Sequence, residues 1–246
     1  MKSLLFVALN LFSMQIFSVS NSIMLEKIRN ELPNLKDSPT GAIDADGNYT
    51  KDTIQGLNCA GFAKWIVDGF YEPLAKSEET KYISLKAARK KHEGERGNAQ
   101  MLVYEQSRDP YFGLDWTRNL ALELEKKRGN QPSYKSNDVI DSTVSKYIAN
   151  CGYPISLIEN VLLEQAEKHP NFFFIASING FYGKPRLWQH YHVAVFIPYE
   201  VDGTQKIAVL ERNKETSFSY LLKRYPNTFC HLVRISMNGE FELMKP

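Results

Sequence analysis

The hydrophobic periodicity of the chain changes near residue 171, and this change limits the folds that the chain can adopt. Before it, apolar residues recur at helical spacing, which predicts helices over residues 23–35, 59–71, 82–92, 114–128, 139–150 and 155–168. After it, apolar and polar residues alternate, which predicts strands over residues 171–178, 191–199, 206–213, 228–237 and 240–244. Asp202-Gly203 and Asn238-Gly239 are typical of two-residue hairpin turns. Helices followed by an antiparallel meander predict an α+β fold with the helices packed on one face of the sheet.

The composition is that of an ordinary globular chain. Its 246 residues are 43% hydrophobic and 24% charged, which excludes collagen, low-complexity disorder and a polytopic membrane protein. A net charge of +2 gives no strong field for nucleic acid or a membrane surface. Three cysteines are too few for a disulfide framework in a chain of this length. We therefore expect no nucleic-acid partner.

The first twenty residues have the pattern of a signal peptide. Lys2 supplies a positive charge, residues 4–17 are mainly apolar, and Ser18-Val19-Ser20 offers small residues for cleavage. The apolar stretch is too short and too polar to span a bilayer comfortably. We expect a signal peptide over residues 1–20, a mature chain of residues 21–246, and export to the periplasm or beyond the cell without stable membrane insertion. In an oxidising compartment Cys151 and Cys230 could pair, or remain two separate thiols.

Cys59 is predicted to open a helix. Asn58 is a favourable N-cap residue, and the free N–H groups and dipole of a first turn favour the thiolate. Cys59 lies on the same apolar stripe as Phe62 and Ile66, so it faces whatever the helix packs against. A cysteine on such a stripe is also compatible with a small core residue. The nucleophile interpretation requires a basic side chain beside Cys59, whereas the core interpretation does not.

A histidine strand could supply that base. A type I′ turn at residues 202–203 makes cross-strand partners sum to 405, which places Glu211 and Asn213 on the side of the sheet that carries His192. Either polar group could orient the His192 ring, as a catalytic imidazole requires. The same face carries the small residue Ala194, and we expect the Cys59 helix to pack there.

Two of these segments resemble those of known enzymes. Asn58-Cys59-Ala60-Gly61-Phe62, followed by Trp65, resembles the Asp-Cys-Ser-Gly-Phe segment of NlpC-type cell-wall endopeptidases. His192-Val193-Ala194-Val195, followed by Glu211-Arg212-Asn213, is similar to the CHAP amidases. Both groups belong to the papain-like cysteine peptidase superfamily. Asn58 replaces the usual Asp, and the usual Tyr-x-Trp-Gly-Gly run before the cysteine is missing, with Tyr49 as a substitute.

The resemblance implies a single papain-like domain over residues 21–246, with a helical insertion at about 73–168. It implies Cys59 as nucleophile, His192 as general base, and Glu211 and Asn213 as the polar groups behind it. It also implies that no metal or cofactor is needed, and that the substrate is an amide bond in peptidoglycan or another envelope component. A thiol acyltransferase or lipid amidase on the same scaffold, and a non-catalytic envelope-binding module, are the alternatives.

Four further residues are candidates for substrate binding: Tyr49, Trp116, Trp188 and His190. Trp116 is equally compatible with a core anchor. His190 and His192, two residues apart on one strand, could suit a metal, but the remaining histidines lie in unrelated contexts. We therefore expect no metal site and a position for His190 at the rim of the cleft.

Overall fold

The computed structural model describes residues 20–38, 49, 56–74, 114–141, 144, 146–182 and 187–244. Residues 1–19 of the expected signal peptide and the predicted helix over residues 82–92 lie outside the described residues. Much of the expected insertion, from residue 75 to residue 113, lies outside them as well.

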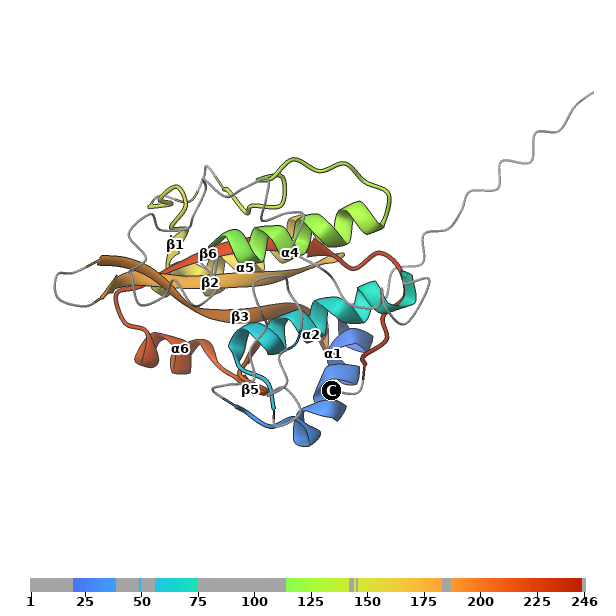
Figure 1. The fold of residues 1–246 in the computed structure, drawn as a ribbon. Helices are drawn as coiled ribbons and strands as arrows, with labels where there is room; N and C mark the ends of the chain where they lie inside the picture. Colours follow the sequence, from blue (N-terminus) through green and yellow to red (C-terminus); the bar gives the residue numbers. More distant parts are fainter. Residues whose placement is uncertain are drawn as a thin grey trace, which may run out of the picture.

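A six-stranded antiparallel sheet forms the centre of the molecule (Figure 1). Its strands lie in the order β1-β6-β2-β3-β4-β5, so the strands that follow each other along the chain pair from β2 to β5. The strands are β1 (Tyr153–Pro154), β2 (Phe172–Tyr182), β3 (Leu187–Val201), β4 (Thr204–Glu211), β5 (Lys214–Thr216) and β6 (Phe229–Ser236). The α+β class is confirmed.

The hairpin between β3 and β4 has the predicted register. Val195 pairs with Leu210 and Val201 with Thr204, so each pair sums to 405. The turn residues Asp202 and Gly203 have φ values of 51° and 72°, the left-handed conformation that a type I′ turn requires. The register places Glu211 on the side of the sheet that carries Phe196 and Val209, because side chains alternate along a strand.

The described residues form five α-helices around the sheet, and four of them match predicted segments. They are α1 (Asn21–Glu31), α2 (Cys59–Tyr71), α4 (Leu114–Lys127), α5 (Ile158–Lys168) and α6 (Phe218–Arg224). Short 3-10 turns follow α1 (Leu32–Asn34) and α2 (Glu72–Leu74) and precede α5 (Ile155–Leu157). Among the helices that the structure describes, none has the length and apolar character needed to cross a bilayer.

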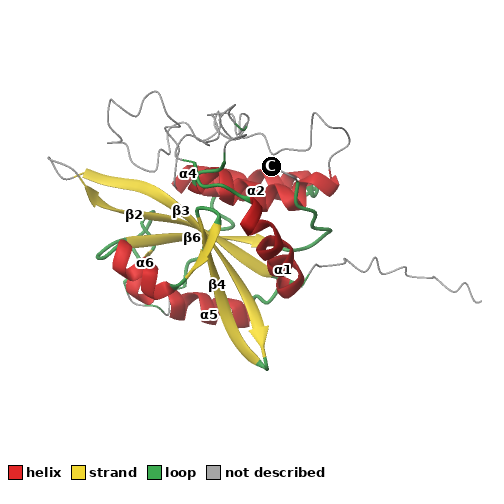
Figure 2. Ribbon diagram, turned by 90° about the horizontal axis from the view of Figure 1, so that it is seen from below, coloured by secondary structure: helices red, strands yellow, loops and turns green. Residues whose placement is uncertain are grey.

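Helices cover both faces of the sheet, so the expectation of a single covered face is wrong (Figure 2). Ile175 and Val195 belong to a core with α1, α2 and α4, whereas Ala176 and Phe196 belong to a second core with α5 and α6. The physical reason is that β2 and β3 are apolar on both sides, and each apolar side must be removed from water.

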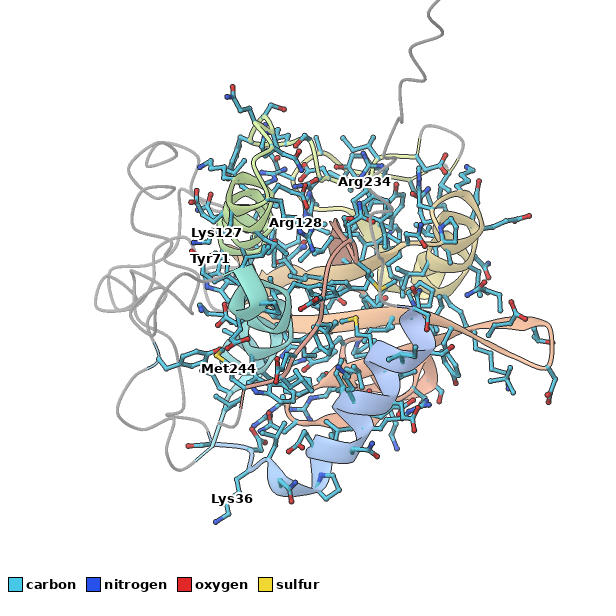
Figure 3. All side chains as sticks on the ribbon, turned by 90° about the vertical axis from the view of Figure 1, so that its right-hand side faces the viewer. Lys36, Tyr71, Lys127, Arg128, Arg234 and Met244 are labelled. Carbon is cyan, nitrogen blue, oxygen red and sulfur yellow. The ribbon has the colours of Figure 1, made fainter. Side chains whose placement is uncertain are left out.

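Two predicted elements are absent from the part of the chain that the structure describes. The described residues of 139–150 do not form a helix: Val139 donates its N–H to the Leu232 carbonyl (3.0 Å), next to the bridge that Asp138 makes with Val233 at the edge of β6. Residues 240–244 are not a strand, because they dock on α2. Glu242 donates its N–H to the Gly69 carbonyl (2.8 Å), and the Trp65 indole donates to the carbonyl of Met244 (2.7 Å), which Figure 3 shows beside α2.

Candidate active site

Cys59 occupies the first turn of α2, as predicted. The Asn58 side chain accepts a hydrogen bond from the Gly61 N–H (2.9 Å) and so caps the helix. The Cys59 sulfur accepts hydrogen bonds from the backbone N–H groups of Ala60 and Val193. One donor belongs to the helix and the other to β3, so the sulfur lies where the two elements meet.

The imidazole of His192 joins the Cys59 sulfur to a carboxylate. His192 Nε2 donates to Glu211 Oε2 over 2.6 Å, and the side chains of His192 and Glu211 are both buried. The Cys59 thiol is hydrogen-bonded to His192. Because Nε2 is bonded to Glu211, Nδ1 is the ring nitrogen that remains for the sulfur. Thiol, imidazole and carboxylate therefore form one hydrogen-bonded line.

The open edge of β3 allows Cys59 to reach His192. The β3–β4 ladder ends at the Val195–Leu210 pair, so β4 does not accompany β3 as far as Val193 and His192. The sulfur receives the Val193 N–H at this edge. The helix itself packs on the face of Val193 and Val195, not on the expected face of Ala194. Cysteine and histidine thus approach from opposite faces and meet at the edge of the sheet.

The three groups alter one another's protonation. Burial disfavours a charged thiolate, but the hydrogen bonds from His192 and from the two N–H groups outweigh it and lower the pKa of Cys59. Burial also disfavours the imidazolium, but the hydrogen bonds with Cys59 and Glu211 outweigh it and raise the pKa of His192 to about 9. The thiolate of Cys59 and the imidazolium of His192 therefore stabilise each other.

Two residues that the sequence did not indicate complete the surroundings of the histidine. Tyr225, directly after α6, stacks on the His192 ring with a centroid distance of 5.1 Å. The Thr216 hydroxyl donates to Glu211 Oε1 over 3.2 Å. Both lie after β4, where neither the α6 helix nor the β5 strand was predicted, and the Ser217 cap of α6 is the local signal that could have indicated the helix before Tyr225.

Asn213 does not meet His192. It lies in the turn between β4 and β5, with a φ of 67°, and not on a strand opposite the histidine. Its side-chain amide donates to the backbone carbonyls of Lys36 and Leu57, so it contacts the segment that leads into α2. Of the two polar residues expected behind His192, the structure brings only Glu211 to the ring.

His190 and His192 lie on opposite faces of the sheet, which corrects the expectation of a shared face. His192 pairs with Ile178 and His190 with Asn179, so a β-bulge at Tyr191 reverses the alternation. His190 Nδ1 bonds Ser177 Oγ (2.8 Å) on the face covered by α2. Across the described part of the chain, no three His, Cys, Asp or Glu side chains are grouped as metal ligands would be.

The other substrate-binding candidates are not gathered around Cys59. Tyr49 donates its hydroxyl to Asp68 Oδ2 (2.8 Å), nine residues along α2 from Cys59, so Tyr49 does not replace the missing motif at the sulfur. Trp116, a residue of α4, is fully buried in the core that α4 shares with α2, which matches the core-anchor interpretation. Trp188 lies in β3, and its side chain is outside the described residues.

The remaining two cysteines are free thiols. Cys151 is half-buried and Cys230 is fully buried, and they are not bonded to each other. Burial raises the pKa of Cys151 to about 11 and raises that of Cys230 further. Among the three thiols, only Cys59 has a pKa shifted toward the reactive thiolate.

An activated thiol beside an imidazole that a carboxylate orients is suited to nucleophilic acyl transfer. Comparison of the chain with protein-family models, with curated proteins and with solved structures finds no match. The residues of this chain are therefore the basis on which a function can be proposed.

Proposed function

We propose that the protein is a cysteine-dependent amide hydrolase with Cys59 as nucleophile, His192 as general acid–base and Glu211 as the residue that orients His192. The observation that carries the proposal is the hydrogen-bonded line from the Cys59 thiol through His192 to Glu211. A merely structural cysteine has no need for a buried imidazole–carboxylate pair, since burying such polar groups costs free energy.

The reaction follows from the protonation of the site. The Cys59 thiolate attacks the carbonyl carbon of an amide, forming a C–S bond and a tetrahedral oxyanion. The first N–H groups of α2 have no partner within the helix, and that of Cys59 is suited to stabilise the oxyanion. The imidazolium of His192 then gives its proton to the departing amine as the C–N bond breaks. Water, deprotonated by His192, attacks the thioester and releases the acid and the thiolate.

The substrate class that we propose is an amide bond of the bacterial cell envelope, with peptidoglycan stems or cross-bridges as the first choice. Two sequence features support it: the signal-peptide pattern of residues 1–20, and the resemblance of the Cys59 and His192 segments to cell-wall endopeptidases and amidases. The reaction class depends on the site, and the substrate class depends on these sequence features.

Alkylation with iodoacetamide tests the reaction class without knowledge of the substrate. We expect Cys59 to be carbamidomethylated rapidly at pH 6, and Cys151 and Cys230 slowly, because the pKa of Cys59 is lowered and those of the other two are raised. Mass spectrometry of peptides locates the label, and Cys151→Ala serves as the matched control for Cys59→Ala. Slow and uniform labelling of the three thiols would favour a non-catalytic binding module.

Digestion of purified peptidoglycan tests the substrate class. We expect the wild-type protein to release new amines and carboxylates, identified by the masses of the fragments, and Cys59→Ala to release none. Identical fragment patterns from the two proteins, combined with rapid labelling of Cys59, would reject peptidoglycan and leave a thiol amidase or acyltransferase for another envelope substrate.

A further inference from the structure

The turn between β4 and β5 has an unusual sequence for its conformation. Glu211 pairs with Lys214, and the two residues between them, Arg212 and Asn213, have φ values of 49° and 67°. A two-residue turn with two positive φ values usually contains Asn-Gly or Asp-Gly, because a Cβ atom disfavours the left-handed region. A turn that contradicts local preference is retained when contacts outside the turn compensate for it.

Those contacts are made to the segment that leads into the Cys59 helix. The Asn213 amide is buried, and its Nδ2 donates to the Leu57 carbonyl (3.0 Å) and to the Lys36 carbonyl. Arg212 adds an ion pair with Asp37, Nη2 to Oδ2 over 2.9 Å. Leu57 is only two residues before Cys59.

The two carbonyls belong to a pair of chain segments that are bonded to each other. Leu57 donates its N–H to the Lys36 carbonyl (2.9 Å), and Ser38 donates to the Leu57 carbonyl (3.2 Å). Gly56, at a φ of 142°, passes so close to Lys36 that a Cβ atom would collide with its carbonyl oxygen. The side chain of Lys36 points away from the body of the molecule (Figure 3), so its backbone carbonyl is the group that Asn213 holds.

The same turn therefore controls both halves of the site. Glu211 directs its carboxylate to His192, and Asn213, two residues later, directs its amide to the segment that sets the start of α2. We infer that Asn213 is a positioning residue for the nucleophile: it fixes Cys59 at the edge of β3, at hydrogen-bonding distance from His192. This inference depends on the proposed function of Cys59 and His192, and it gives Asn213 a role that differs from orienting the imidazole.

The hydrogen bonds exclude a direct action of Asn213 on His192. The two ring nitrogens are used by Glu211 and Cys59, and both donor bonds of the Asn213 amide end on backbone carbonyls. Loss of Asn213 should consequently alter the position of the sulfur and leave the imidazole–carboxylate pair intact.

The variant Asn213→Gly tests the inference because glycine keeps the positive φ and removes the side chain that carries the amide. We expect the alkylation rate of Cys59 at pH 6 to fall about 10- to 100-fold, since a displacement on the order of 1 Å has an effect of this size at a reactive centre. We also expect the pH midpoint of alkylation to rise toward that of an ordinary thiol. The variant Asn213→Asp, which tolerates the same φ but cannot donate, should act in the same direction.

Asp202→Gly is the matched control, because Asp202 is exposed and occupies a left-handed position in the turn at the other end of β4. It should leave the alkylation profile unchanged. Thermal unfolding of each variant shows which of them are folded, and the comparison uses those that are.

A second measurement separates the two possible roles of Asn213. In a Cys59→Ala background, the pKa of His192 measured by NMR should be the same with and without Asn213→Gly, whereas Glu211→Gln should lower it. A fall in the pKa of His192 on removal of Asn213 alone, or an unchanged alkylation profile in both Asn213 variants, would overturn the inference. Neither measurement uses a substrate. An unreactive Cys59 in the wild-type protein would refute the proposed function before any variant is compared, so the two failures are distinguishable.

Discussion

The sheet carries two buried histidine–carboxylate pairs, one on each face. His192 and Glu211 lie on the face of α5 and α6, joined over 2.6 Å, and His231 and Asp138 lie on the face of α4, with Nε2 and Oδ2 3.3 Å apart. The third group differs. In the first pair the third group is the Cys59 thiol, which is hydrogen-bonded to His192. In the second pair it is Arg118, which donates two hydrogen bonds of 2.9 and 2.6 Å to Asp138.

The third group decides what the histidine does. Beside a thiol, the pKa of His192 is raised to about 9, because the hydrogen bonds with Cys59 and Glu211 outweigh the effect of burial. Beside a guanidinium, burial lowers the pKa of His231, and its hydrogen bond with Asp138 does not compensate. In the first arrangement the histidine holds a proton that can be transferred, whereas in the second a histidine that burial keeps neutral lies beside the Arg118–Asp138 ion pair. A buried histidine–carboxylate contact alone therefore does not identify an active site.

Glu211→Gln should have the largest effect on the reactivity of the Cys59–His192 pair. Glutamine can donate to the ring nitrogen as well as accept, so it favours the wrong tautomer of His192, and the hydrolysis rate should fall about 10³- to 10⁴-fold. The pKa of His192 should fall with it. Glu215→Gln is the matched control, because Glu215 lies on the same hairpin and makes only a surface pair with Arg29 (2.7 Å). A hydrolysis rate of Glu211→Gln within tenfold of the wild-type rate would contradict the proposed role.

Asp138→Asn should have the largest effect on the stability of the fold and none on the chemistry of Cys59. It leaves the buried Arg118 guanidinium without its counter-charge, which costs about 3–5 kcal/mol of unfolding free energy. Urea unfolding measures the loss, and the exposed Asp202→Asn, expected to stay within about 0.5 kcal/mol, is the control. A change in the alkylation rate of Cys59 in folded Asp138→Asn would show that the two pairs are coupled.

The pH dependence of stability should come mainly from His231. The folded-state pKa of His231 is below its unfolded value of 6.5, so its contribution is present above about pH 6.5 and is lost as the pH falls. The pKa of His192 is raised to about 9 and that of Cys59 is lowered, so the proton that His192 gains on folding offsets the one that Cys59 loses, and the pair adds little slope between about pH 6.5 and 9. His231 contributes a slope of at most about 1.4 kcal/mol per pH unit. Urea unfolding of His231→Gln between pH 5 and pH 9 should show a smaller acid slope than the wild type, and an unchanged slope would refute the assignment.

Thr216→Val should have the smallest effect. It removes the hydroxyl that donates to Glu211 Oε1 over 3.2 Å and keeps the shape of the side chain. We therefore expect the loss of one hydrogen bond, worth about 0.5–1 kcal/mol. Cys59 alkylation at pH 6 should slow about two- to fivefold, and Thr204→Val at the exposed end of β4 should leave it unchanged. A fall in Cys59 reactivity as large as that caused by Glu211→Gln would mean that Thr216, and not the carboxylate itself, controls the protonation of His192.

The parts of the site that could be predicted depend on short-range rules. Asn58 and Cys59 were predicted because a helix start has its own local chemistry, and α2 begins where the sequence predicts it. Glu211 was predicted because one recognisable turn, Asp202-Gly203, sets the register of the whole β3–β4 hairpin.

The parts that could not be predicted depend on contacts between distant segments. The helix α6 has seven residues, too few to show a period, and its Ser217 cap was the only local signal of it. Arg212 and Asn213 form a turn against their preference because partners 156 to 177 residues away hold them. Residues 139–150 have a helical pattern, but their first residue, Val139, donates its N–H to the Leu232 carbonyl at the edge of β6 instead of entering a helix.

The extra residue at Tyr191 has a wider consequence. Because β3 gains one residue relative to β2 at this point, His190 before the bulge and His192 after it face opposite sides of the sheet. One continuous strand thereby places histidines on both faces of the sheet. The His192 imidazole lies at the sulfur of Cys59, and the His190 imidazole lies on the face that α2 covers. Substitutions after Tyr191 can then change the surroundings of Cys59, and substitutions before it can change the core under α2, each independently of the other.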